Sequence, residues 1–217
     1  MTMPLFDCLA AGALRQEQLG PGATVLRQFA VPAETALLSA LRDVVTQAPF
    51  RHMATPGGFL MSVAMTNCGA LGWVTDRTGY RYDAADPVSG LPWPQMPDAF
   101  YRLATGAAAQ AGFRAYRLDA CLINRYAPGA RLSLHQDKDE QDFDQPIVSV
   151  SLGIPAVFVF GGLRRADKAS RVQLTHGDVV VWGGPARLRY HGVLPLKEGH
   201  HPLLGGYRIN LTFRKAA

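Results

Sequence analysis

From Ala120 onward, the chain is a succession of short β-prone runs separated by Gly, Pro and Asp. Many short strands punctuated in this way predict a sandwich or barrel. The most apolar stretch, 147–163, is interrupted by serine, glycine and proline, so it predicts buried strands and not a membrane-spanning helix. The β-prone runs are ACLINRY, PIVSVSLG, AVFVFGG, RVQLTH, DVVVWGG, LRYHGV and YRINLTF.

The first half of the chain supplies helices. Residues 32–47 and 97–111 carry apolar side chains at helical spacing, with a proline at each start and Gly112 after the second. They are expected to brace one face of the β core. Between them, 55–93 is poorly periodic and rich in turn residues, so we expect a functional loop-rich region. With 217 residues, 48% of them hydrophobic, the chain predicts one domain.

Charge and cysteine usage bear on partners and compartment. The net charge of +5 suits a phosphate-bearing partner, although a merely basic soluble protein would show the same surplus. Cys8, Cys68 and Cys121 are odd in number and widely spaced, which argues against a disulfide framework. The first residues lack the basic region of a secretion signal, so we expect a cytoplasmic protein.

A possible metal site begins at His135-Gln136-Asp137. In an extended segment, residues i and i+2 point to the same face, so His135 and Asp137 can reach one ion. With the distant His191 they form the two-histidine, one-carboxylate set of non-haem iron(II) oxygenases, for which zinc is the competing ion. A second triplet, 176–178, also has the H-x-D form, but its central glycine and the strand that follows indicate a turn.

The segment 207–214 alternates strictly between apolar and polar residues. Arg208, Asn210, Thr212 and Arg214 share one face of the predicted strand. Guanidinium groups bind carboxylates through paired hydrogen bonds, so two arginines at even spacing can hold a dicarboxylate. Asn124 and Tyr126 share a face of another predicted strand and extend this polar pocket, whereas a structural strand would turn its polar side to solvent.

Six segments together resemble the bacterial AlkB alkylation-repair dioxygenases, and the likeness extends from about residue 55 to 214. The resemblance implies a mainly β fold with flanking helices (α+β), with a double-stranded β-helix, or jelly-roll, core. The segments are TPGGFLMSVAMTNCGALGW, CLINRYAPGARLSLHQDKDE, PIVSVSLGIPAVFVFGG, HGDVVVWGG, RLRYHG and YRINLTFR.

By this resemblance, the cofactors are Fe(II) and the cosubstrates 2-oxoglutarate and O2. The metal ligands are His135, Asp137 and His191, and these with Arg214 form the catalytic centre. Arg208 would bind the distal carboxylate of 2-oxoglutarate, and Arg214 would lie nearer the metal. The residues implied to hold 2-oxoglutarate are Asn124, Tyr126, Arg208, Asn210, Thr212 and Arg214.

The resemblance also implies a nucleotide-recognition lid. Trp73 would stack on a flipped base, with His135 on the other face of that base. The substrate-binding residues are then Thr55, Met65, Trp73, Tyr80, Lys138, Asp139 and Arg165. Four of them have a plainer interpretation, since Trp73 could be core, Lys138 and Asp139 a solvated turn, and Arg165 with Arg164 an exposed hairpin tip.

The implied activity is oxidative demethylation of bases such as 1-methyladenine and 3-methylcytosine, with release of succinate, CO2 and formaldehyde. Expected partners are single-stranded or base-flipped double-stranded DNA, with RNA as a further candidate, and no membrane. We expect one monomeric dioxygenase domain over 1–217, with an N-terminal extension and bracing helix (about 1–50), a lid (about 51–95), and a helix plus jelly-roll core (about 96–217). The rivals are a dioxygenase of protein or small-molecule substrates and a non-catalytic nucleic-acid-binding β-barrel.

Overall fold

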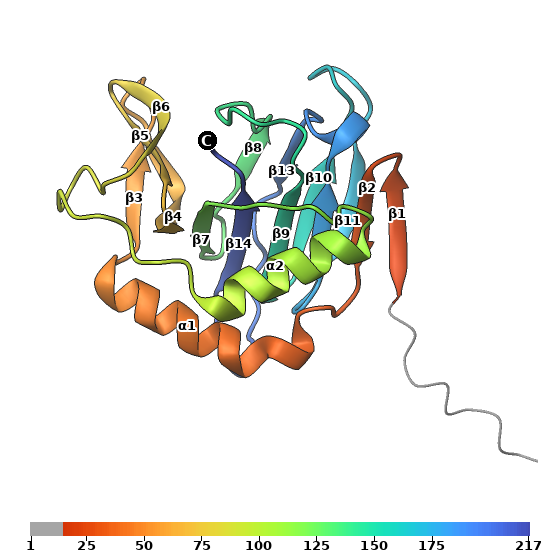
Figure 1. Ribbon diagram of the computed structural model, residues 1–217, viewed down its shortest axis with the longest axis horizontal. Helices are drawn as coiled ribbons and strands as arrows, with labels where there is room; N and C mark the ends of the chain where they lie inside the picture. The colour runs from red at the N-terminus through yellow and green to blue at the C-terminus, as the bar shows by residue number, and fades with distance from the viewer. Residues whose placement is uncertain (1–14) are drawn as a thin grey trace, which may run out of the picture.

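The computed structural model describes residues 15–217, which form two antiparallel sheets packed on each other and a separate hairpin (Figure 1). The large sheet has the order β1-β2-β12-β9-β14-β7-β4-β3, the small sheet β11-β10-β13-β8, and the hairpin is β5-β6. The strands are β1 (Gln16–Gly20), β2 (Ala23–Leu26), β3 (Arg51–Ala54), β4 (Leu60–Gly69), β5 (Gly72–Asp76), β6 (Gly79–Asp83), β7 (Ala120–Tyr126), β8 (Leu132–His135), β9 (Ile147–Gly153), β10 (Ala156–Phe160), β11 (Ser170–Leu174), β12 (Val179–Trp182), β13 (His191–Val193) and β14 (Arg208–Arg214).

An apolar core fills the space between the two sheets. Ile147 and Trp182 of the large sheet and Phe158 and Phe160 of the small sheet are buried in it. The rings of Phe158 and Trp182 lie 6.1 Å apart between centroids, so the two layers are in direct contact. This arrangement confirms the predicted jelly roll, since interdigitating inner faces are what hold two sheets together.

Two helices cover the outer face of the large sheet (Figure 1). They are α1 (Glu34–Gln47), preceded by a 3₁₀ turn at Val31–Ala33, and α2 (Asp98–Gln110), within two residues of the predicted ranges; a second 3₁₀ turn lies at Gly184–Ala186. Phe100 of α2 packs edge-on against Phe213 of β14, with ring centroids 5.9 Å apart. The predicted bracing role of the helices is confirmed.

Strand β14 lies between β9 and β7, in the interior of the large sheet. Its apolar side, which includes Ile209, Leu211 and Phe213, packs in the core beneath the helices. Its polar side faces the other way, into the space between the sheets, and is buried as well. A strand buried on both faces that still carries two arginines needs partners for those charges inside the fold.

The middle of the chain is more regular than the sequence predicted. Instead of a loop-rich region, it contains β4, a ten-residue strand within the large sheet, and the β5–β6 hairpin. The hairpin turn forms because the Asp76 carboxylate accepts a hydrogen bond from the Thr78 N–H (2.8 Å) and Gly79 adopts a φ of 129°. The sequence of this region lacks the alternation of apolar and polar residues that marks a half-buried strand. The reason is that β4 is buried on both faces over much of its length, while the hairpin has few buried residues.

Two further strands, β1 and β2, were not anticipated in the N-terminal extension. They extend the large sheet through the pairing of β2 with β12. Gly22 makes their turn possible, since its φ is 76° and a Cβ there would lie 2.4 Å from the Gly183 carbonyl oxygen. Polar β1 gives little apolar signal because it is exposed at the sheet edge.

The described cysteines agree with the expectation of free thiols. Cys68 and Cys121 are buried, unoxidised and directly opposite each other on β4 and β7. Cys8 lies outside the described residues. Within 15–217, neither helix has the length and apolarity required to cross a membrane.

Candidate active site

The three predicted metal ligands meet at one point between the sheets. His135 ends β8 and lies directly opposite His191, the first residue of β13, while Asp137 follows two residues after His135. The Nε2 atoms of His135 and His191 each lie 3.6 Å from an oxygen of Asp137. Ligand atoms from all three residues lie within 4.8 Å of one another, so one ion can contact all three.

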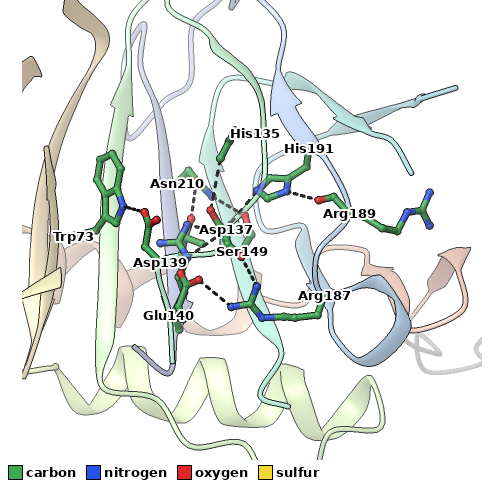
Figure 2. Close-up of polar contacts among 12 residues, drawn as sticks. Trp73, His135, Asp137, Asp139, Glu140, Ser149, Arg187, Arg189, His191 and Asn210 are labelled. Carbon is green, nitrogen blue, oxygen red and sulfur yellow. Dashed lines mark hydrogen bonds and ion pairs between the residues drawn. The ribbon is translucent and has the colours of Figure 1, made fainter. Parts of the chain in front are cut away.

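Backbone carbonyls orient both imidazoles. Nδ1 of His135 is 2.8 Å from the Ser133 carbonyl oxygen. Nδ1 of His191 is 3.0 Å from the Arg189 carbonyl oxygen (Figure 2). Because a carbonyl only accepts, each neutral ring carries its proton on Nδ1 and leaves the Nε2 lone pair for a cation. Burial, together with the neighbouring His135, lowers the pKa of His191 to about 4, so this imidazole is neutral near pH 7.

Asp137 is ionised despite being buried. Burial alone would raise its pKa, but Arg214 and the two neighbouring histidines together hold the pKa of Asp137 well below its usual range. Nε and Nη2 of Arg214 donate to Oδ2 of Asp137 at 3.0 and 2.7 Å. The site therefore offers two neutral nitrogens and one anionic oxygen, a set that suits Fe(II).

The polar face of β14 supplies the second part of the site. Arg208 stacks over the Tyr126 ring, with its guanidinium carbon 4.9 Å from the ring centroid, and its Nη2 donates to Ser151 Oγ at 2.9 Å. Nε and Nη1 of Arg208, Nη1 of Arg214 and the Tyr126 hydroxyl are buried without a hydrogen-bond partner among residues 15–217. Buried donors are costly when unpaired, so these groups point to an anionic ligand.

Asn210 and Thr212 form the wall between the two arginines. The Asn210 amide donates to Ser149 Oγ (2.8 Å) and the Val150 carbonyl (3.0 Å), while its oxygen accepts from Thr212 Oγ1 (3.0 Å). The Asn124 amide also donates to Asn210 Oδ1, at 3.4 Å. This network holds the wall rigid, and it leaves Asn124 Oδ1 unpaired.

All the predicted site residues line one cavity of about 680 Å³. The metal ligands and the arginine strand lie within it, with Met65 buried in its wall. Thr55, Tyr80, Lys138, Asp139 and Arg165 are also among its lining residues. A cavity of this size accommodates a small diacid together with a nucleobase-sized group.

Trp73 is partly buried and packs against the core between the sheets. Its environment therefore combines the two interpretations made from sequence, a core residue and a residue exposed to a bound base. Its indole Nε1 donates to Asp139 Oδ2 at 2.9 Å (Figure 2), and its ring stacks with Tyr80 at 5.7 Å between centroids. The buried Asn67 amide brackets the Trp73 backbone, donating to its carbonyl and accepting from its N–H at 3.0 Å each. The ring is thus held at the cavity wall.

The two neighbouring arginines of the β10–β11 connection behave differently. Arg164 is bound to Asp167, as an ordinary hairpin tip would be. Arg165 is exposed but lines the cavity, with its guanidinium carbon 5.8 Å from the Tyr190 ring centroid. Lys138 and Asp139 are exposed too, as a charged turn would be, yet both line the cavity.

Sequence reasoning missed several residues that shape the site. They hold site residues directly or through one another, by hydrogen bonds and ion pairs, and apart from the bond between Asn67 and Trp73 these contacts join segments far apart in sequence. These residues are Asn67, Tyr82, Glu140, Ser149, Ser151 and Arg187.

Comparison with known proteins agrees with this geometry. The sequence model of the 2OG-Fe(II) oxygenase superfamily matches residues 22–214. The chain is 60% identical over 213 residues to the alpha-ketoglutarate-dependent dioxygenase AlkB of Salmonella typhimurium, covering 98% of this chain and 99% of that protein. It is 58% identical over 212 residues to the protein of the same name from Escherichia coli, covering 98% of each. The solved structure of OsALKBH1 superposes with a TM-score of 0.80 at 29% identity, covering 93% of this chain and 100% of that one.

The chain therefore belongs to the Fe(II)- and 2-oxoglutarate-dependent oxygenase superfamily, and within it to the AlkB dioxygenases. It is an enzyme that uses Fe(II) and 2-oxoglutarate. The structure fits both groups, because the triad presents free ligand atoms and the unpaired arginine donors face the same cavity.

Proposed function

We propose that this dioxygenase removes methyl groups from ring nitrogens of nucleic-acid bases, of the 1-methyladenine and 3-methylcytosine type, in DNA, with RNA as a further candidate substrate. The observation that carries the proposal is the position of Trp73, which is held at the wall of the cavity that contains the metal triad. An aromatic ring at that position suits a base that has left its stack. The net charge of +5 suits the phosphates that accompany it.

In this proposal, His135, Asp137 and His191 hold Fe(II), and Arg208 and Arg214 hold the carboxylates of 2-oxoglutarate with Asn124 and Tyr126. When bound, these groups supply oxidation of the N-methyl carbon by O2, yielding succinate, CO2 and formaldehyde. The protein orients the reacting groups and excludes water.

The same proposal assigns substrate roles to the rim. Trp73 and His135 sandwich the flipped base, and Asp139, fixed by its bond to the indole, faces it. Thr55, Tyr80, Lys138 and Arg165 contact the nucleotide strand around it. Strands β3 to β6 serve as the lid of a single domain, and we expect the enzyme to act as a cytoplasmic monomer on single-stranded or base-flipped double-stranded DNA.

A direct test uses mass spectrometry of a methylated oligonucleotide incubated with protein, Fe(II), ascorbate and 2-oxoglutarate. The expected result is the loss of one methyl group from the base, with formaldehyde and succinate formed. An unmethylated oligonucleotide of the same sequence is the control. If the oligonucleotide stays intact while 2-oxoglutarate is consumed, the enzyme acts on another substrate class. If no succinate forms, a non-catalytic module is the better interpretation.

Trp73→Ala tests the role of the rim. Loss of one stacking contact should weaken oligonucleotide binding by about 1–3 kcal/mol, or roughly 5- to 150-fold. Metal and 2-oxoglutarate binding should persist, because those groups lie on the jelly-roll strands and on the segment after β8. The matched control is Tyr101→Ala, which removes an exposed aromatic ring from α2, outside the cavity.

A packed core tryptophan would behave differently in the same experiment. Truncation would then cost about 3–5 kcal/mol of unfolding free energy, and all activities would fall together. Such a stability loss, or oligonucleotide binding equal to that of the unsubstituted protein, would falsify the stacking role of Trp73.

A further inference from the structure

Four charged side chains form a buried cluster that includes the aspartate of the metal triad. They are two carboxylates and two guanidinium groups, with side chains at most 9% exposed: Asp137, Glu140, Arg187 and Arg214. Glu140 lies between the arginines, with Oε2 3.1 Å from Arg187 Nη2 and Oε1 3.3 Å from Arg214 Nε. Opposite charges balance within the cluster, which is the condition for burying them at all.

Arg214 is shared between the two carboxylates. Its Nε is 3.0 Å from Asp137 Oδ2 and 3.3 Å from Glu140 Oε1. A carboxylate held by a guanidinium is a weaker ligand for a cation, because both compete for the same oxygen lone pairs. By taking part of this guanidinium, Glu140 leaves Asp137 more available to a metal.

Arg187 fixes the backbone of the same segment. Its Nη1 donates to the Asp137 carbonyl at 2.8 Å, and its Nε donates to the Gln145 carbonyl at 3.1 Å. Glu140 holds the other end of this guanidinium (Figure 2). The position of Asp137 therefore depends on Glu140 by two routes, through Arg214 to its side chain and through Arg187 to its main chain.

The cluster also reaches the β5–β6 hairpin. The Tyr82 hydroxyl donates to Glu140 Oε1 at 2.7 Å. Tyr82 lies directly opposite Trp73 in the hairpin register, and Trp73 donates to Asp139. Two facing residues of the hairpin thus bind two consecutive residues of the segment that carries the metal ligand.

We propose that Glu140 is a positioning residue for the metal ligand Asp137 and that Tyr82, acting through Glu140, joins the base-binding hairpin to the metal centre. The inference rests on the metal role assigned to Asp137 under the proposed function. It adds that the hairpin is coupled to the metal centre at Tyr82, through the hydrogen bond to Glu140, so a change at Tyr82 should alter metal binding.

The test measures the affinity for Co(II), whose visible absorption reports its coordination, in the full-length protein without oligonucleotide. Glu140→Gln should bind Co(II) about 10- to 100-fold more weakly and with an altered spectrum, as is typical for residues that orient metal ligands. Tyr82→Phe, which keeps the ring, should weaken binding about threefold to fivefold through the loss of one hydrogen bond to a carboxylate. Glu198→Gln, an exposed acid outside the cavity, is the control and should bind as the unsubstituted protein does.

The protein that carries both Tyr82→Phe and Glu140→Gln tests whether Tyr82 acts on the metal site through Glu140. If Tyr82 acts through Glu140, the combination should bind Co(II) no more weakly than Glu140→Gln alone, whereas independent effects would multiply. Multiplying effects, or a folded Glu140→Gln protein with unchanged affinity and spectrum, would overturn the inference. If Glu140→Gln does not fold, the Tyr82→Phe variant becomes the deciding test. Unchanged Co(II) binding by Tyr82→Phe would then overturn the inference. Failure of the demethylation test with these Co(II) results intact would instead count against the proposed substrate.

Discussion

His135-Gln136-Asp137 lies at the end of β8 inside the cavity, whereas His176-Gly177-Asp178 forms the turn between β11 and β12. Both Asp178 oxygens are fully engaged: Oδ1 accepts from the Gln28 N–H, and Oδ2 from Arg27, from the Thr175 N–H and from the Thr175 hydroxyl. In the first triplet, Nε2 of His135 makes no hydrogen bond, and one oxygen of Asp137, Oδ1, accepts no hydrogen bond within the described chain.

The two histidines differ in the same way. His176 accepts the Gly153 N–H at Nδ1, so the neutral ring carries its proton on Nε2, and the Glu34 carboxylate lies 2.6 Å from that atom. His135 uses only Nδ1. Gly177 shapes the second triplet as a turn, since its φ is 84° and a Cβ would lie 2.4 Å from Val31. What separates a metal ligand from a structural residue is thus which lone pairs the fold leaves unused.

The largest expected difference between the triplets is in metal binding and turnover. Asp137→Ala and His135→Ala should abolish turnover and weaken metal binding beyond the roughly 10- to 100-fold typical of outer residues. His176→Ala should leave the metal affinity unchanged. Calorimetric titration of the metal-free proteins measures this, and loss of metal by His176→Ala with retention by His135→Ala would reverse the assignment.

The second difference is in stability. Asp178→Ala removes a fully buried carboxylate that pairs with Arg27 and is the acceptor for the Gln28 and Thr175 N–H groups, so it should lower the unfolding free energy by about 3 kcal/mol. The metal affinity of the folded protein should stay the same. Urea denaturation gives the free energy, with Asp144→Ala at an exposed position as the control. If Asp178→Ala lowered the unfolding free energy by less than Asp144→Ala does, the structural role assigned to this turn would be wrong.

A smaller effect is expected at the end of β14 nearest the second triplet. Arg208 lies opposite Gly153, whose N–H is bound by His176. Arg208→Lys keeps the charge but loses the paired contact, so 2-oxoglutarate affinity should fall about tenfold or more while metal binding persists. Equilibrium titration with 2-oxoglutarate measures it, with Arg171→Lys on exposed β11 as control. An unchanged affinity would exclude Arg208 from the cosubstrate pocket.

The smallest expected effect concerns the pKa of one metal ligand, His191. The pKa of His191 is lowered by burial from its ordinary 6.5 to about 4 in the folded, metal-free protein. The unfolded chain therefore takes up this proton first, so the contribution of His191 to stability is lost as the pH falls from about 6.5 to about 4. NMR of the imidazole against pH should show a midpoint near 4, and a midpoint at or above 6.5 would contradict the buried environment described here.

The spacing of apolar residues along the sequence was enough to predict the helices and strands that bury only one apolar face. Both helices and the alternation of β14 followed from sequence because each buries one apolar face against the helix–sheet core. Strands β4, β5 and β6 escaped prediction because their burial does not alternate simply along the sequence. Edge strand β1 escaped for the opposite reason, since it is largely exposed and has little apolar signal.

The sequence by itself determined the residue types of the site and their strand spacing, which place His135 with Asp137 and Arg208 with Arg214 on common faces. The central glycine already marked 176–178 as a turn. The sequence could not show which carboxylate oxygens stay without a hydrogen bond, because the partners of Asp137 and Asp178 come from segments as far as 77 and 151 residues away. Only the tertiary structure set Glu140 between two arginines and bound Tyr82 to it. The physical reason is that hydrogen bonds and ion pairs depend on distance in space, which sequence periodicity encodes only within one element.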